Sequence, residues 1–326
     1  MQVRILSEEH VRAAVPMEEA IDAMGEAFGQ ISAFQAEIPL RSAVSGEDGV
    51  MLIMPGRLKE SGAFGAKVVS VFEKNPERGL PAVNALVLMV DPTTGLPTAI
   101  MEGTYLTALR TGAASGLATE LLARPEASVL TVFGAGVQAR TQVAAVRAVR
   151  PIEEVRIVSR TRASAEAFAE ELRAGDGGLE VRVLEDRAEA VRGAHVICTA
   201  TTSSEPVFPG EAVDPGAHVN GVGSYRPTSR EVDDALVRRA RIVVDSMEAA
   251  MEEAGDIIGP IRRNVISRTK IHGELGEVVN GRKRGRADDQ EITFFKSVGN
   301  AAQDLAVGRR VVERAEAEDL GTVAEL

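Results

Sequence analysis

The chain has 326 residues, of which 44% are hydrophobic and 3% aromatic, so it is long enough for two domains with aliphatic cores. A formal net charge of -11 argues against a nucleic-acid partner, because phosphate binding relies on clustered Lys and Arg. The longest apolar runs, such as residues 85–90, stop far short of the ~20 residues that span a bilayer, and no basic segment followed by an apolar stretch opens the chain. We therefore expect a cytoplasmic protein with a small-molecule substrate and no membrane partner.

The cysteine and histidine content gives no sign of a metal site. Cys198 is the single cysteine and cannot form an internal disulfide, and His10, His195, His218 and His272 show no metal-ligand spacing. We expect no metal. His195 and His218 lie in apolar runs, so we interpret them as internal or strand-end histidines.

The first third of the chain predicts helices followed by a meandering sheet. Ser7 is placed as a helix N-cap, and apolar residues then recur at helical spacing at Ile21, Met24, Ala27 and Phe28. Short apolar runs separated by turn residues follow, at 50–54, 66–71 and 83–90. A further helix, over residues 106–123, ends before Pro125.

From residue 129 onward, apolar strands alternate with helical stretches, which is typical of an α/β fold with a doubly wound parallel Rossmann sheet. The candidate strands are 129–133, 155–159, 181–184, 195–200, 218–222 and 242–245. The final segment, 294–326, comes too late in the chain to join this sheet, and we expect it to return to the first domain. The expected division is a mixed α+β substrate-binding and dimerisation domain of residues 1–117 with 298–326, and a dinucleotide-binding Rossmann domain of residues 118–297.

A glycine turn after the first of these strands is the strongest local motif. Gly134 would allow the tight turn, Gly136 would let the backbone approach a pyrophosphate, and Ala139 would let the next helix pack closely. The amides at the start of that helix, at Val137 and Gln138, would face the phosphates. The alternative is a tight turn with a purely structural role.

The residues after the second strand bear on the choice of cofactor. The acidic residue that would bind the ribose hydroxyls of NAD is missing from the stretch Ser159-Arg160-Thr161-Arg162. Either arginine could pair with a 2′-phosphate, and Ser159 and Thr161 could hydrogen-bond to it, which favours NADP over NAD. NAD stays open, because an arginine can also stack on adenine.

Small and hydroxyl-bearing residues end the fourth and fifth strands, at the carboxyl edge where ligands bind in such sheets. We interpret these residues as contacts on the nicotinamide side of the cofactor. They are Thr199, Ala200, Thr201, Val222, Gly223 and Ser224.

Three cations of the first domain lie among apolar or small residues: Arg41, Lys67 and Arg110. A buried cation requires an anionic partner. For each of them an exposed or salt-bridged side chain is the alternative, and composition alone does not bring the three together.

Several short motifs are spread over nearly the whole chain. They are Met54-Pro55-Gly56, Gly65-Ala66-Lys67, Gly79-Leu80-Pro81, the stretches 91–95, 106–115 and 134–139, and Lys296-Ser297-Val298-Gly299. Together they resemble the ornithine cyclodeaminase and mu-crystallin family. The resemblance implies a homodimer whose first domain is completed by the C-terminal helix and carries the dimer contact. It also implies that Arg41, Lys67 and Arg110 hold a substrate carboxylate. Thr111, Ser297 and Gly299 are candidate cofactor contacts, with helix-start geometry as the alternative.

The stretch 220–227 bears on the chemistry within this family. In ornithine cyclodeaminases the matching stretch resembles glycine-aspartate-cysteine-proline, and its aspartate assists the amine chemistry, whereas Tyr225 stands at that position here. A tyrosine, with a reference pKa near ~10, cannot supply a carboxylate or activate water at neutral pH. The sequence therefore favours the members that work as imine reductases or amino-acid dehydrogenases.

The expected reaction is NAD(P)H-dependent reduction of a small imino or 2-oxo acid to an amino acid. Arg41 and Arg110 would pin the carboxylate, and Lys67, its pKa depressed by neighbouring cations, would polarise or protonate the substrate nitrogen or oxygen. By family position, Met54 and Asn84 would line the pocket. Pyrroline-2-carboxylate, piperideine-2-carboxylate and pyruvate with ammonia all fit this description. An ornithine cyclodeaminase-type lyase and a non-catalytic, mu-crystallin-like binding protein are the alternatives.

Overall fold

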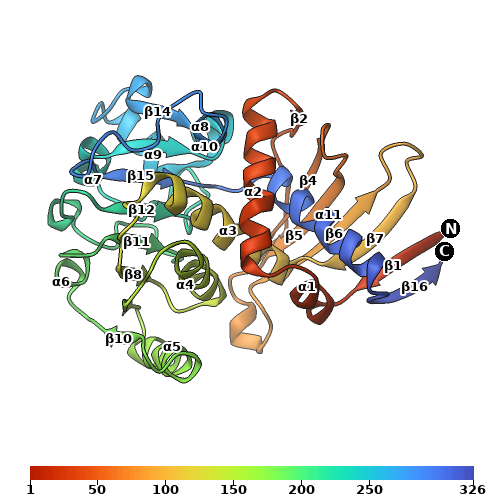
Figure 1. Cartoon of the computed structure of the whole chain (residues 1–326), viewed down its shortest axis with the longest axis horizontal. Helices are drawn as coiled ribbons and strands as arrows, with labels where there is room; N and C mark the ends of the chain where they lie inside the picture. The colour runs from red at the N-terminus through yellow and green to blue at the C-terminus, as the bar shows by residue number, and fades with distance from the viewer. The chain divides into compact units, whose positions relative to one another are not determined.

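The computed structural model describes residues 1–326, apart from the side chain of Pro76. The chain forms two compact units: unit 1 consists of Met1–Arg110 with Asn300–Leu326, and unit 2 consists of Thr111–Gly299. These divisions fall after residues 110 and 299, whereas the sequence places them after residues 117 and 297. Both positions of the first division lie within helix α3 (Thr104–Leu122) (Figure 1).

Unit 1 is built on a mixed eight-stranded sheet. In sheet order its strands are β16 (Thr322–Glu325), β1 (Gln2–Leu6), β7 (Pro97–Glu102), β6 (Val83–Val90), β5 (Phe64–Val71), β4 (Val50–Leu58) and β2 (Ala36–Glu37), with β3 (Ser42–Ser45) also paired to β4. Strands β4 to β7 form an antiparallel meander, which confirms the meandering sheet predicted from the short apolar runs. A 3₁₀ turn, η1 (Asn75–Arg78), lies between β5 and β6.

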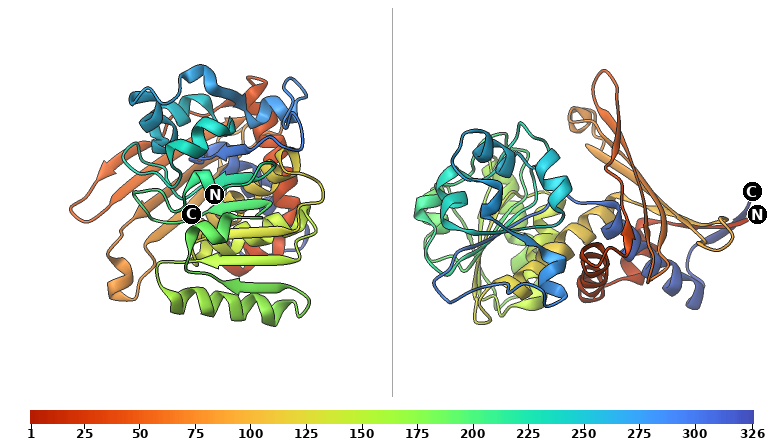
Figure 2. Two further views of the ribbon diagram at one scale, coloured as in Figure 1. Left: turned by 90° about the vertical axis from the view of Figure 1, so that its left-hand side faces the viewer. Right: turned by 90° about the horizontal axis from the view of Figure 1, so that it is seen from above.

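Three helices cover one face of this sheet: α1 (Glu8–Ala14), α2 (Met17–Ser32) and α11 (Ala301–Ala317) (Figures 1 and 2). Ser7 caps α1 as predicted, because its hydroxyl accepts a hydrogen bond from the amide of His10. The predicted apolar stripe of Ile21, Met24, Ala27 and Phe28 is buried in α2. Helix α11 packs against α2 and β4 to β6, so the C-terminal helix completes the core of unit 1.

Unit 2 contains an eight-stranded sheet in which every pair of neighbours is parallel. In sheet order its strands are β10 (Glu180–Val183), β9 (Glu154–Val158), β8 (Val129–Phe133), β11 (Val196–Thr199), β12 (His218–Gly221), β15 (Thr293–Lys296), β13 (Arg241–Val244) and β14 (Ile271–Glu274). Each of the six predicted strands is present within one residue of its expected bounds.

Helices cover both faces of the parallel sheet. They are α4 (Val137–Val149), α5 (Arg162–Gly175), α6 (Arg187–Val191), α7 (Asp234–Arg239), α8 (Met247–Glu253), α9 (Gly255–Arg262) and α10 (Leu275–Val279), with 3₁₀ turns η2 (Gly210–Ala212) and η3 (Arg268–Lys270). Val132 of β8 packs into an apolar cluster with α4 and α5, whereas Phe133 packs into a second cluster with α7, α8 and α9. Since successive residues of a strand point to opposite faces, this arrangement confirms the α/β, doubly wound Rossmann fold.

One expectation about the end of the chain is wrong. Residues 293–296 form β15 and pair with both β12 and β13, so this segment does belong to the parallel sheet. Only the part that follows, with α11 and β16, joins unit 1. Strand β14, at the edge of the sheet, was also missed, because its sequence Ile-His-Gly-Glu contains no apolar run.

The interpretation of two histidines as internal or strand-end residues is confirmed. His218 is buried and its ring nitrogens contact Thr293 Oγ1 at 2.9 Å and Asn220 Oδ1 at 3.0 Å. His195 directly precedes β11, and its Nδ1 accepts a hydrogen bond from the amide of Ser128. Among the described residues, no helix has both the length and the apolar character that a membrane crossing requires.

Candidate functional site

The glycine turn joins β8 to α4 in the geometry expected of a phosphate-binding turn. Gly134 has a φ of 112°, and a Cβ at this position would lie 2.4 Å from the carbonyl oxygen of Ala200. Gly136 is the N-cap of α4, and a Cβ there would meet nothing within 4 Å. Gly134 is therefore required by the fold, whereas the open side of Gly136 leaves room for a ligand beside the amides of Val137 and Gln138.

The end of β9 lies beside this turn, because Phe133 and Val158 are partners in the parallel ladder. Arg160 is exposed, in the loop between β9 and α5. Arg162 instead pairs with Glu185, at 2.7 Å. The two arginines therefore differ, because Arg162 already has a carboxylate partner whereas Arg160 is exposed.

The ends of β11 and β12 converge on Glu231, a buried residue that the sequence analysis did not single out. Its Oε1 accepts hydrogen bonds from the amide and the hydroxyl of Thr201, at 2.8 and 2.7 Å. Its Oε2 accepts from the hydroxyl of Thr199 at 2.9 Å and from the amides of Gly223 and Ser224 at 2.8 and 3.2 Å. Most of the predicted nicotinamide-side residues therefore share one carboxylate.

Glu231 is in turn held by a buried ion pair. The amides of Glu231 and Val232 donate to Oδ1 of Asp256, at 2.7 and 3.1 Å. The other oxygen of Asp256 lies 2.9 Å from Nζ of Lys296, which also donates to the carbonyl of Ser224 at 2.5 Å. Burial raises the pKa of Glu231 and nearby Asp256 acts in the same direction, whereas Lys296 lowers it.

Asp245 organises the segment that leaves β15. One carboxylate oxygen accepts hydrogen bonds from the hydroxyl of Ser297 and from the amides of Val298 and Gly299, at 2.8, 2.9 and 2.8 Å. Gly299 has a φ of 76°, which favours glycine. The structure thus places Ser297 and Gly299 at the carboxyl edge of the parallel sheet, next to the ends of β13 and β15.

Two of the three predicted substrate-site cations meet on a carboxylate inside unit 1. Nζ of Lys67, on β5, lies 2.8 Å from Oδ1 of Asp304, and Nε of Arg110 lies 3.0 Å from the same oxygen. Arg110 also donates to the side-chain oxygen of Gln303 at 2.6 Å. Burial and the charge of Arg110 lower the pKa of Lys67 to about 7, opposed by Asp304, and the charge of Arg41 acts in the lowering direction.

Several polar atoms beside this cluster have no hydrogen-bond partner among the described residues. They are Oδ2 of Asp304, Nε2 of Gln303 and both amide atoms of Asn300. Buried polar atoms of this kind are uncommon in folded proteins and are expected where a ligand or water binds. Met54 lies opposite Lys67 in the ladder and so shares its face, but Asn84 pairs with Ser70 and lies on the other face of the sheet.

Asp304 was not among the residues predicted from the sequence. The signal in the sequence is an acidic residue inside the otherwise uncharged stretch 301–308. As with the three cations, a charge among apolar residues requires a partner of opposite sign. Among the described residues, no group of three or more His, Cys, Asp or Glu side chains is arranged to hold a metal ion.

Comparison with known proteins identifies the family of this chain. The sequence model of the ornithine cyclodeaminase/mu-crystallin family matches residues 1–319. This chain belongs to that family. It is 39% identical over 324 residues to the Delta(1)-pyrroline-2-carboxylate reductase of Bacillus cereus, covering 98% of this chain and 99% of the relative.

Solved structures of the family are similar over the full length. The Thermococcus litoralis Delta(1)-pyrroline-2-carboxylate reductase in complex with NADH and L-proline superposes with a TM-score of 0.95, at 41% identity over 98% of this chain and 99% of the other. An archaeal alanine dehydrogenase dimer with bound NAD gives a TM-score of 0.94, at 37% identity over the whole of both chains.

Tyr225, predicted to match the aspartate of ornithine cyclodeaminases, is half-buried in the loop after β12. It packs against the apolar cluster on the α7 to α9 side of the parallel sheet, and the guanidinium of Arg226 lies 5.5 Å from its ring. The loop is held closely, because a Cβ on Gly255 would lie 2.1 Å from the carbonyl oxygen of Ser229.

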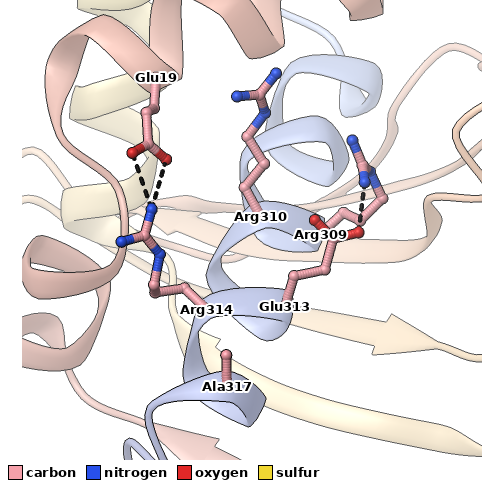
Figure 3. Close-up of a pocket in the computed structure, with 6 residues that line it drawn as sticks. All are labelled: Glu19, Arg309, Arg310, Glu313, Arg314 and Ala317. Atoms are coloured by element: carbon pink, nitrogen blue, oxygen red, sulfur yellow. Dashed lines mark hydrogen bonds and ion pairs between the residues drawn. The ribbon is translucent and has the colours of Figure 1, made fainter.

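A pocket of about 280 Å³ lies elsewhere in unit 1, lined by residues of α2 and α11 (Figure 3). Its arginines are paired: Arg314 lies 2.9 Å from Glu19, and Arg309 and Arg310 lie 2.9 and 2.5 Å from Glu26. These ion pairs tie the C-terminal helix to α2. Because each charge already has a counter-ion, this pocket does not resemble a substrate site.

Proposed function

We propose that this chain is an oxidoreductase that uses NAD(P)H to reduce a small imino acid, or a 2-oxo acid with ammonia, to the L-amino acid. The cluster of Lys67, Arg110 and Asp304 carries the proposal. Two cations share a single carboxylate in a buried setting, so the site has an excess positive charge that a substrate carboxylate would balance. The relatives named as pyrroline-2-carboxylate reductase and alanine dehydrogenase support this class of reaction.

The residues of unit 2 fit a dinucleotide. The open side of Gly136, the amides of Val137 and Gln138, and the exposed Val137 are suited to the pyrophosphate end of a cofactor. Ser159, Arg160 and Thr161 would bind the adenosine ribose, and Arg160 would pair with a 2′-phosphate, so NADP is the proposed cofactor and NAD the alternative. NADH and NAD are the cofactors in the two similar structures described above.

The residues of unit 1 would bind and protonate the substrate. Arg41 and Arg110 would hold the carboxylate, with Lys67 beside them. When bound, the cofactor would supply the hydride. Lys67 has a pKa of about 7, so near neutral pH its protonated form can donate a proton to the substrate nitrogen or oxygen and be recharged from solvent.

A homodimer is also proposed, through the uncovered face of the sheet in unit 1. Ile53, Val68 and Leu86 are adjacent in the ladder and are 37%, 41% and 56% exposed. The helices α2 and α11 lie on the opposite face (Figure 2). A contiguous apolar patch of this kind marks an interaction surface, and the similar alanine dehydrogenase structure is described as a dimer.

The decisive experiment is an assay of NADH and NADPH oxidation with pyrroline-2-carboxylate, piperideine-2-carboxylate and pyruvate plus ammonium. A parallel reaction would test ammonia release from ornithine with catalytic NAD. Turnover of any imine or of pyruvate with ammonium supports the proposal. Release of ammonia from ornithine with no reductase activity would replace it with a cyclodeaminase, and tight cofactor binding without any turnover would indicate a binding protein.

A further inference from the structure

Glu231 joins the ends of two neighbouring strands, β11 and β12, at the carboxyl edge of the parallel sheet. One carboxylate oxygen is bound by Thr201, which follows β11, and the other is bound by Thr199 and by the amides of Gly223 and Ser224, after β12. The side chain is completely buried and accepts from five donors. An ionised carboxylate has only acceptor sites, so each of these donors meets an acceptor.

The two strand ends that Glu231 joins are also packed tightly against each other. A Cβ on Gly223 would lie 2.4 Å from the carbonyl oxygen of Thr201 and 2.5 Å from Oε1 of Glu231. Ala200, which precedes Thr201, is also packed closely, because a Cβ on Gly134 would lie 2.4 Å from the carbonyl oxygen of Ala200. Glu231 is thus linked through Thr201 and Ala200 to the glycine turn.

The topology shows which half of a cofactor this arrangement would affect. β8 lies between β9 and β11, so the adenosine end of a dinucleotide falls on the β9 side of the glycine turn and the nicotinamide end falls on the β11 and β12 side. Glu231 lies on the second side only. Its position is rigid, because Asp256 and Lys296 hold its backbone and the Ser224 carbonyl.

We propose that Glu231 is a positioning residue for the nicotinamide half of the cofactor. Its carboxylate fixes the spacing between residues 199–201 and 222–224, and thereby the orientation of the nicotinamide and its ribose. This inference rests on the proposed function, since it assumes that unit 2 binds NAD(P)H. It does not require contact between Glu231 and the cofactor.

The Glu231→Gln substitution tests the proposal because it keeps the shape of the side chain but replaces one acceptor with an NH₂ donor. In either orientation of the amide, that NH₂ group faces at least one backbone N–H, of Thr201 or of Gly223 and Ser224. The two donors repel, and one strand end must move away. Glu205→Gln, which changes an exposed carboxylate of the same unit, is the matched control.

Binding of NADPH and of ADP to the purified full chain would be measured by calorimetry, together with thermal unfolding. ADP contains the adenosine and the pyrophosphate but neither the nicotinamide nor its ribose. Glu231→Gln is expected to weaken NADPH binding by about ten-fold while changing ADP binding by less than about two-fold. Glu205→Gln is expected to change neither.

Equal loss of NADPH and ADP binding, or no loss of either, would overturn the proposal. If Glu231→Gln does not fold, Thr199→Val removes a single donor to the same carboxylate, and it must show a smaller effect with the same selectivity for NADPH. Failure of the unaltered protein to bind NADPH, NADH and ADP would instead overturn the proposed function itself, so the two failures are distinguishable.

Discussion

Nζ of Lys67 lies 2.8 Å from Oδ1 of Asp304, although 237 residues separate the two in the chain. Both side chains are almost completely buried. Burial and Arg110 lower the pKa of Lys67 to about 7, and Asp304 is the group that keeps it from falling further. The pair therefore sets the pH range in which Lys67 can exchange a proton.

Asp304→Asn is expected to shift the pH dependence of the reductive reaction. The substitution removes the negative charge that raises the pKa of Lys67, so this pKa falls below about 7. The decline of kcat/KM on the alkaline side should then begin at a lower pH than in the unaltered protein. An unchanged pH profile would exclude this role, and Asp22→Asn, on the exposed face of α2, is the control.

Lys67→Met is expected to lower kcat for reduction by about 100-fold or more, because it removes the proposed proton donor. In the unaltered protein the donor is protonated below about pH 7, so the reductive rate should fall as the pH rises through this value. Oxidation of the amino acid needs Lys67 in its neutral form, as the proton acceptor. The rate of oxidation should therefore rise as the pH rises through about 7. Lys59→Met, which removes a half-exposed lysine paired with Glu37, should leave both profiles unchanged.

Substitutions in the glycine turn should separate a structural glycine from a ligand-binding one. Gly134→Ala introduces a Cβ at a positive φ and 2.4 Å from the Ala200 carbonyl, so the unfolding temperature should fall along with cofactor binding. Gly136→Ala meets nothing within 4 Å in the protein. Because Ala is a poorer N-cap than Gly, Gly136→Ala should lower the unfolding temperature slightly, by less than Gly134→Ala does, and should bind NADPH about ten-fold more weakly, which calorimetry would show. Unchanged NADPH binding by Gly136→Ala would contradict the placement of the pyrophosphate.

Arg160 and Arg162 offer a matched pair for the cofactor preference. Arg160→Ala should raise KM for NADPH by about ten-fold and leave KM for NADH nearly unchanged, because it removes a charged partner of the 2′-phosphate. Arg162→Ala should have little effect on either, since this side chain is already paired with Glu185. If Arg160→Ala raises KM equally for NADPH and NADH, stacking of the Arg160 side chain on adenine is the better explanation.

Val68→Glu is expected to convert the proposed dimer to a monomer, because it places a charge in the middle of the apolar patch on the open face of the unit 1 sheet. Light scattering coupled to size-exclusion chromatography would measure the mass. Leu96→Glu, on an exposed leucine in the turn between β6 and β7, serves as the control. A Val68→Glu protein that keeps the mass of a dimer would place the interface elsewhere.

The parallel sheet and the glycine turn could be predicted from the sequence because their signals are local. The six predicted strands are apolar runs bounded by turns, and Gly134 and Gly136 follow a strand directly. β14 was not recognised because its sequence, Ile-His-Gly-Glu, contains no apolar run, and β15 was not recognised because it comes so late in the chain that it was assigned to the first domain. Asp304 and Glu231 act through contacts with residues far away in the chain, and Glu231 lies in a polar stretch whose pattern is typical of any exposed loop.

The division of the chain also has a consequence for the order of events during protein synthesis. Unit 2 is one continuous segment, whereas unit 1 needs both Met1–Arg110 and Asn300–Leu326. Domains generally fold as units while the chain emerges from the ribosome. A nascent chain that has reached residue 299 therefore contains every strand of the parallel sheet, but the apolar face of β4 to β6 still lacks α11 and Lys67 still lacks Asp304. The cation cluster is assembled only when the last part of the chain is released.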